Sequence, residues 1–159
     1  MQQEREPAID GTQTDFIVFE SGCLLTPDAV ESLEDDLHQN PSDTIKRLKL
    51  LGFYTFSKHG RRSASDWLRH MAWMIENCPS YWISGHVQIP DEVSESEIER
   101  LSQLWLAKVA IDPDSAAIAG RAAQFMIAHD PALAERLLIR SEQLQPDTLN
   151  GHAACFHCG

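Results

Sequence analysis

Apolar residues recur at helical spacing along most of the chain, and turn-forming residues separate these runs. The pattern is clearest between Leu104 and Thr148. There Asp112-Pro113-Asp114-Ser115 ends one helix and begins another, because Pro113 cannot continue a helix and Asp114 or Ser115 can cap the next one. Asp130-Pro131 then supplies a cap and a first-turn proline for a second helix, which Gln145-Pro146-Asp147-Thr148 ends. We predict a helical hairpin whose apolar positions are Ile118, Ala122, Phe125, Met126, His129, Leu133, Leu137, Leu138 and Leu144.

Similar signals predict helices earlier in the chain. One helix opens at Thr26-Pro27-Asp28 and ends at Asn40-Pro41, a second spans about 42–58, and a third is capped by Ser63 or Ser65. Another begins at the capping box Ser94-Glu95-Ser96-Glu97. Gly52 lies inside the second helix, where glycine costs about 1 kcal/mol relative to alanine. We therefore expect a neighbouring helix to approach closely at Gly52.

The remaining segments divide the chain into an arm, one helical domain and a tail. Residues 1–13 are polar and lack periodicity, which predicts a disordered arm. Residues 15–20 fit a short strand or a strap packed on the helices, and residues 80–93 form a long connection, for which packing is favoured over function. The predicted domain covers 14–148, and 149–159 form the tail.

The prolines of the turns are regularly spaced. Pro146 lies 33 residues after Pro113, which lies 34 after Pro79, which in turn lies 38 after Pro41. Such periods are typical of helical repeats. With Ala134, Leu138 and Ser141 ahead of the last turn, and Leu51-Gly52 with Tyr54 in an earlier helix, the segment from about 42 to 148 resembles the tetratricopeptide repeat family. Trp67 and Arg121 depart from that family's pattern, and 80–93 does not resemble a first helix.

The resemblance implies an architecture and a way of binding. The fold would be all-α, with antiparallel helical hairpins stacked as a short right-handed solenoid. In this family the first helices line a concave groove that holds a protein or peptide. Carried over to this chain, the groove residues would be Arg47, Tyr54, Lys58, Arg121 and Gln124.

Composition narrows the class of protein. The chain has 159 residues, 43% hydrophobic and 8% aromatic, which is ordinary for a soluble globular domain. No apolar run approaches the roughly 18 residues of a membrane span, and the N-terminus lacks the features of a secretory signal. We expect a cytoplasmic protein with no membrane partner. The net charge of −11 argues against nucleic acid as a partner.

Charge is distributed in two opposite blocks. Residues 1–43 hold eleven Asp or Glu against Arg5 alone, whereas residues 44–70 hold seven Lys or Arg against Asp66. The acidic block could neutralise the basic block within the molecule. Alternatively the basic block, through Lys46, Arg47, Lys58, Arg61 and Arg62, could bind an acidic partner, or the grooves could be filled by the protein's own N-terminal arm.

Candidate chemistry is confined to the tail. Cys155 and Cys158 bracket His157, and His152 lies upstream. Thiolates and imidazoles bind zinc, but one Cys-x-x-Cys pair is weak evidence for a site. No nucleophile elbow, P-loop or dinucleotide-binding glycine pattern is present. We therefore expect a noncatalytic protein-interaction module or scaffold without a cofactor, the alternative being a small metal-binding or redox protein that uses this tail.

Overall fold

The computed structural model describes residues 11–56, 61–86 and 88–145, and every regular element in these ranges is a helix. The all-α prediction is therefore confirmed for the described residues. The contacts divide the chain into two compact units, Met1–His70 and Met71–Gly159, where the sequence predicted one helical domain over 14–148. The division falls within α4 (Arg61–Asn77).

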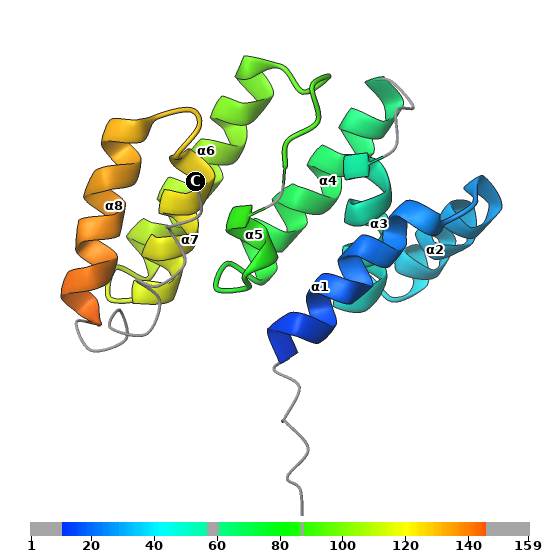
Figure 1. Ribbon diagram of the computed structural model, residues 1–159, viewed down its shortest axis with the longest axis horizontal. Coiled ribbons are helices and arrows are strands. Elements are labelled where there is room, and N and C mark those ends of the chain that lie inside the picture. The colour runs from blue at the N-terminus through cyan, green and yellow to red at the C-terminus, as the bar shows by residue number, and fades with distance from the viewer. Residues whose placement is uncertain (1–10, 57–60, 87, 146–159) are drawn as a thin grey trace, which may run out of the picture. The chain divides into compact units, whose positions relative to one another are not determined.

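The first unit contains α1 (Gly11–Ser21), the 3₁₀ helix η1 (Gly22–Leu24), α2 (Pro27–Gln39), α3 (Thr44–Phe56) and the beginning of α4. Helix α1 and η1 pack along α3 (Figure 1). Two glycines make this packing possible: a Cβ on Gly52 would lie 1.8 Å from the carbonyl oxygen of Phe19, and one on Gly22 would lie 2.1 Å from that of Lys49. The close approach expected at Gly52 is confirmed.

Helix α1 was missed by the sequence analysis. It begins at Gly11, inside the segment predicted to be a disordered arm, and it covers residues 15–20, for which a strand or a strap was expected. Phe19 is buried at the contact with α3, whereas Phe16 and Ile17 on the same helix are exposed. The helix is therefore held by one buried face and by the glycine contacts.

The other helices of this unit begin close to the predicted positions. Thr26 caps α2, its hydroxyl oxygen accepting a bond from the Ala29 amide at 3.3 Å. The Asp43 carboxylate accepts a bond from the amide of Lys46 at 3.1 Å, which fixes the first turn of α3. Helix α4 begins at Arg61, before Ser63 and Ser65, so neither serine is its cap.

The second unit contains the rest of α4, then α5 (Ile83–His86), α6 (Glu95–Ile111), α7 (Ala116–Met126) and α8 (Pro131–Leu144). Helices α7 and α8 lie side by side as the predicted hairpin (Figure 1). Ser115 and Asp130 cap them, as expected. Ala134 is buried in α8, whereas Leu138 and His129, which were expected on the apolar face, are exposed.

Residues 80–93 contain the short helix α5, which packs against α7. Ile83 and Ser84 are buried, and a Cβ on Gly85 would lie 2.6 Å from the carbonyl oxygen of Arg121. These contacts agree with the interpretation of the segment as packing. Helix α6 then starts as predicted, since Glu97 accepts bonds from the amide and the hydroxyl of Ser94 at 2.9 and 2.7 Å.

Among the described helices, none combines the length and the apolar character that crossing a membrane requires.

Candidate functional site

An open groove runs over α2, α3 and the first part of α4 in the first unit, with a volume of about 760 Å³. Its apolar floor comes from Val30 and Phe53. Most of the other lining residues have polar or charged side chains. The groove is lined by Pro27, Val30, Glu31, Glu34, Asp35, His38, Phe53, Tyr54, Asp66 and Arg69.

Glu34 of α2 is the centre of the polar groups in this groove. Its Oε1 accepts hydrogen bonds from the Tyr54 hydroxyl at 2.8 Å, from His70 Nε2 at 2.8 Å and from an Arg69 nitrogen at 2.9 Å. Side chains of α3 and α4 thus donate to a single carboxylate oxygen of α2. The second oxygen, Oε2, is buried and has no hydrogen-bond partner within the part of the chain that the structure describes.

The orientation of His70 follows from its neighbours. Its Nδ1 lies 3.1 Å from an Arg47 guanidinium nitrogen, which can only donate, so Nδ1 accepts and Nε2 carries the proton toward Glu34. Arg47 itself is anchored because two further nitrogens donate to the Pro41 carbonyl at 3.2 and 2.7 Å. The ring of His70 also stacks on Tyr54, with centroids 5.8 Å apart. These contacts hold His70 as a neutral imidazole.

Burial and the hydrogen bonds between these side chains shift the pKa values of Glu34, His70 and Tyr54. Burial raises the pKa of Glu34, but the hydrogen bond and the positive charge of protonated His70, with the hydrogen bonds from Tyr54 and Arg69, outweigh it and lower this pKa from 4.5 to about 2. Burial lowers the pKa of His70 below 6.5, which Arg69 and Arg47 reinforce and Glu34 opposes. Burial and the bond to Glu34 raise the pKa of Tyr54 well above 10. Glu34 is therefore a stable anion at neutral pH, and Tyr54 is a stable neutral donor.

The groove has an excess of negative charge. Glu31, Glu34, Asp35 and Asp66 supply four carboxylates against the single guanidinium of Arg69, and together these five groups carry a net −3. Arg69 is also shared, because it pairs with Glu34 at 2.9 Å and with Asp66 at 3.1 Å. Glu31 and Asp35 are exposed along the α2 side.

The residues predicted to bind a partner are divided between the two units. Arg47 and Tyr54 are 6% and 5% exposed, and their polar atoms bond within the first unit, where Tyr54 also lines the groove. Arg121 and Gln124 lie on α7 of the second unit, where Arg121 donates to the Gln124 side chain at 2.9 Å. Lys58 and the side chains of Arg61 and Arg62 lie outside the described residues.

The two charge blocks meet within the first unit. Lys46 pairs with Asp36 at 2.9 Å and with Asp43 at 3.6 Å, and Arg69 pairs with Glu34. The acidic partners in these pairs come from α2 and the turn that follows it. These pairs agree with the interpretation that the acidic segment neutralises the basic one.

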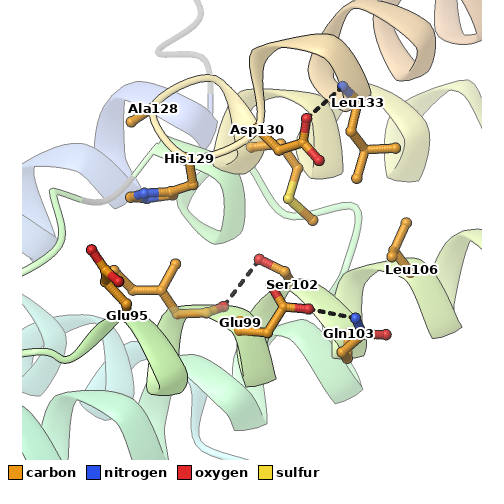
Figure 2. A pocket seen from close by; sticks show the side chains of 11 residues that line it. Glu95, Glu99, Ser102, Gln103, Leu106, Ala128, His129, Asp130 and Leu133 are labelled. Atoms are coloured by element: carbon orange, nitrogen blue, oxygen red, sulfur yellow. Dashed lines mark hydrogen bonds between the residues drawn. The ribbon is translucent and has the colours of Figure 1, made fainter.

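A second cavity, of about 520 Å³, lies in the second unit between α6 and the turn that joins α7 to α8. Figure 2 shows His129 and Asp130 on one wall and Glu95, Glu99 and Gln103 on the other. Several of its polar groups bond to one another or to backbone: Gln103 donates to Glu99 at 2.6 Å, and Asp130 accepts from the Leu133 amide at 3.0 Å.

No group of three or more His, Cys, Asp or Glu side chains able to hold a metal ion occurs among the described residues. The tail residues His152, Cys155, His157 and Cys158 lie outside those residues, so the metal or redox alternative stays a prediction.

No protein-family model matches this chain, and no curated protein or solved structure matches it either.

Sequence reasoning missed the residues that build the groove. Glu34 and His70 are 36 positions apart, and Glu34 and Arg69 are 35 apart, so no local motif links them. Apolar periodicity placed α2 and α3 but did not reveal that charged side chains of three helices converge. The only available signal was the pair of opposite charge blocks, which contain Glu34 and Arg69 respectively.

Proposed function

We propose that this protein is a noncatalytic interaction module that binds a segment of a protein or peptide, and that the groove over α2, α3 and α4 is its docking surface. The observation that carries the proposal is the combination of a buried apolar floor with charged groups that are already held in place. Preorganised groups lose little conformational freedom when a partner binds, so more of the contact energy contributes to affinity.

The ionisation states favour binding over acid–base catalysis. A general acid or base works best with a pKa near the operating pH. At the centre of this groove the pKa of Glu34 is lowered to about 2, and that of Tyr54 is raised. His70 is fully buried between two partners, which leaves it no route to a substrate proton. These groups suit a fixed recognition surface.

The proposed architecture is a short right-handed solenoid of hairpins that resembles tetratricopeptide repeats. Its support is that the turns at Pro41, Pro79 and Pro113 fall between helices and recur at similar spacing. Of the residues that the resemblance implies, Tyr54 lines this groove with its hydroxyl bonded to Glu34, whereas Arg47 is buried against His70. In this proposal their role is to position Glu34 and His70.

A peptide selection tests the function. Displayed random dodecapeptides are selected on the full-length chain, and the best are measured against two variants, His38→Trp and His129→Trp. Both positions are exposed, but His38 lines the proposed groove and His129 lines the cavity of Figure 2. Circular dichroism checks that both variants keep their helix content.

We expect His38→Trp to weaken peptide binding by about tenfold or more, because the indole fills the groove, and His129→Trp to leave it unchanged. Failure to select any peptide would overturn the proposal. So would binding that His129→Trp blocks and His38→Trp leaves intact.

A further inference from the structure

Resting on the proposed function, we infer that the segment bound in the groove carries a Lys or Arg side chain beside an apolar one, with the cation placed among the carboxylates of α2. Three observations combine here: the net −3 of the lining, the exposed carboxylates of Glu31 and Asp35, and the apolar floor. The occupant is a segment of another protein.

Charge complementarity sets the sign of the partner. Glu31 and Asp35 are exposed and have no ion-pair partner within the described part of the chain, whereas Asp66 is already paired with Arg69. An approaching cation meets these two carboxylates first. An acidic segment would meet them as like charges, which disfavours binding. The acidic partner suggested by the basic block is thus replaced by a basic one.

Glu34 adds a fixed negative charge behind the exposed carboxylates. Its Oε1 accepts three hydrogen bonds and its Oε2 is buried, so a bound cation contacts Glu31 and Asp35 and is attracted by the Glu34 charge without touching it. The network from Tyr54, His70 and Arg69 keeps the carboxylate fixed while the cation arrives.

The apolar floor accounts for the rest of the segment. Val30 and Phe53 are each 8% exposed and border the groove, and Pro27 extends this surface at the start of α2. A Lys or Arg side chain can lay its methylene stem along such a surface while its charged end reaches the carboxylates. An apolar neighbour in the segment would cover the remaining floor.

The test uses the selected dodecapeptides with the full-length chain and the variants Glu31→Lys and Asp35→Lys. The matched control is Glu135→Lys, an exposed glutamate on α8 of the second unit. Each peptide is also made with its Lys replaced by norleucine, or its Arg by citrulline, which removes the charge and keeps most of the shape. Affinities are measured by calorimetry at low and physiological salt.

We expect the selected peptides to be enriched in Lys or Arg. Each α2 reversal should weaken their binding about tenfold, and the effect should shrink as added salt shortens the Debye length to about 8 Å. Replacing the peptide's Lys or Arg by its neutral analogue should weaken binding to Glu31→Lys and Asp35→Lys less than it weakens binding to the natural chain. The reason is that the protein change and the peptide change both remove the same ion pair. Glu135→Lys should have no effect.

Two results separate this inference from the proposed function. Peptides that His38→Trp blocks, but that lack basic residues and ignore both α2 reversals, would overturn the basic-segment inference and leave the docking groove standing. Loss of affinity in Glu135→Lys equal to that in the α2 variants would show general charge repulsion and would also overturn it. Failure of His38→Trp to block any peptide would overturn the groove itself.

Discussion

Replacing Glu34 with glutamine tests whether the buried network holds the first unit together. The carboxylate is 14% exposed and accepts three hydrogen bonds, from Tyr54, His70 and Arg69. Glutamine keeps the size and one acceptor oxygen but removes the charge, and it places an amide nitrogen near the site of the unsatisfied Oε2. Hydrogen bonds to a charged group contribute about 1.5 to 3 kcal/mol each, and those to a neutral group about 1 kcal/mol.

The pKa of Glu34 gives a second magnitude for the same contacts. Its fall from 4.5 to about 2 means that the folded state favours the charged carboxylate. At about 1.4 kcal/mol for each tenfold change in the ionisation constant, this corresponds to at most about 3 kcal/mol at pH 7, because part of the shift comes from the charge of protonated His70, which is neutral at that pH. Because the amide retains part of the hydrogen bonding, we expect Glu34→Gln to lower the free energy of unfolding by about 2 to 3 kcal/mol at pH 7.

Urea unfolding at pH 7 measures the loss, and hydrogen exchange of the α2 and α3 amides assigns it to the first unit. Glu31→Gln is the control, since Glu31 lies one turn earlier on the same helix and is exposed. A surface change of this kind should stay within about 0.5 kcal/mol. If Glu34→Gln behaved like Glu31→Gln, the network would contribute little and the reasoning from its contacts would be refuted.

Three further predictions follow from particular contacts. Gly52→Ala should destabilise the first unit by about 3 kcal/mol or more, because its Cβ would lie 1.8 Å from the Phe19 carbonyl oxygen. Gly120→Ala should cost far less, because its Cβ would meet the Ser141 side chain, with Oγ at 3.1 Å, and no backbone atom of another element. Equal shifts of the thermal unfolding temperature in the two variants would contradict this. Ala134→Leu should overpack the α7–α8 contact and lower the free energy of unfolding by about 1 to 3 kcal/mol, because Ala134 is buried. Ala132→Leu, at an exposed position of the same helix, should have little effect, and equal thermal unfolding of the two variants would contradict the prediction. The free energy of unfolding should fall as the pH drops below 6.5, because the pKa of His70 is lowered in the folded state and protonation therefore favours the unfolded chain. It should fall again between pH 4.5 and about 2, where the lowered pKa of Glu34 has the same effect. Denaturant titrations in which this free energy rises on acidification through pH 6 would refute the prediction.

The local features of the fold could be predicted because their causes lie within a few residues. Thr26, Ser115 and Asp130 each cap a helix through a bond to an amide three residues later, so the sequence alone exposes the start of these helices. Gly52 was informative for a different reason: glycine is so unfavourable inside a helix that its presence signalled close packing.

Tertiary features could not be predicted in this way. Helix α1 has a weak amphipathic pattern, with Phe16 and Ile17 exposed beside buried Phe19, and its contact with α3 depends on backbone approach at Gly22 and Gly52. The groove depends on Glu34 meeting His70 across 36 residues. Basic residues such as Arg47 looked available for a partner, but their intramolecular bonds are visible only once the helices are packed.

The central claim is that a partner segment binds in the groove over α2, α3 and α4. Backbone amide chemical shifts of the isotopically labelled full-length chain, followed during titration with the tightest selected dodecapeptide, test it most directly. The account predicts shifts concentrated at Val30, Glu34, Phe53 and Arg69, in fast or intermediate exchange, with the α6 amides unchanged. Shifts confined to Glu95–Ile111 and the α7–α8 turn, with the groove residues unmoved, would contradict it.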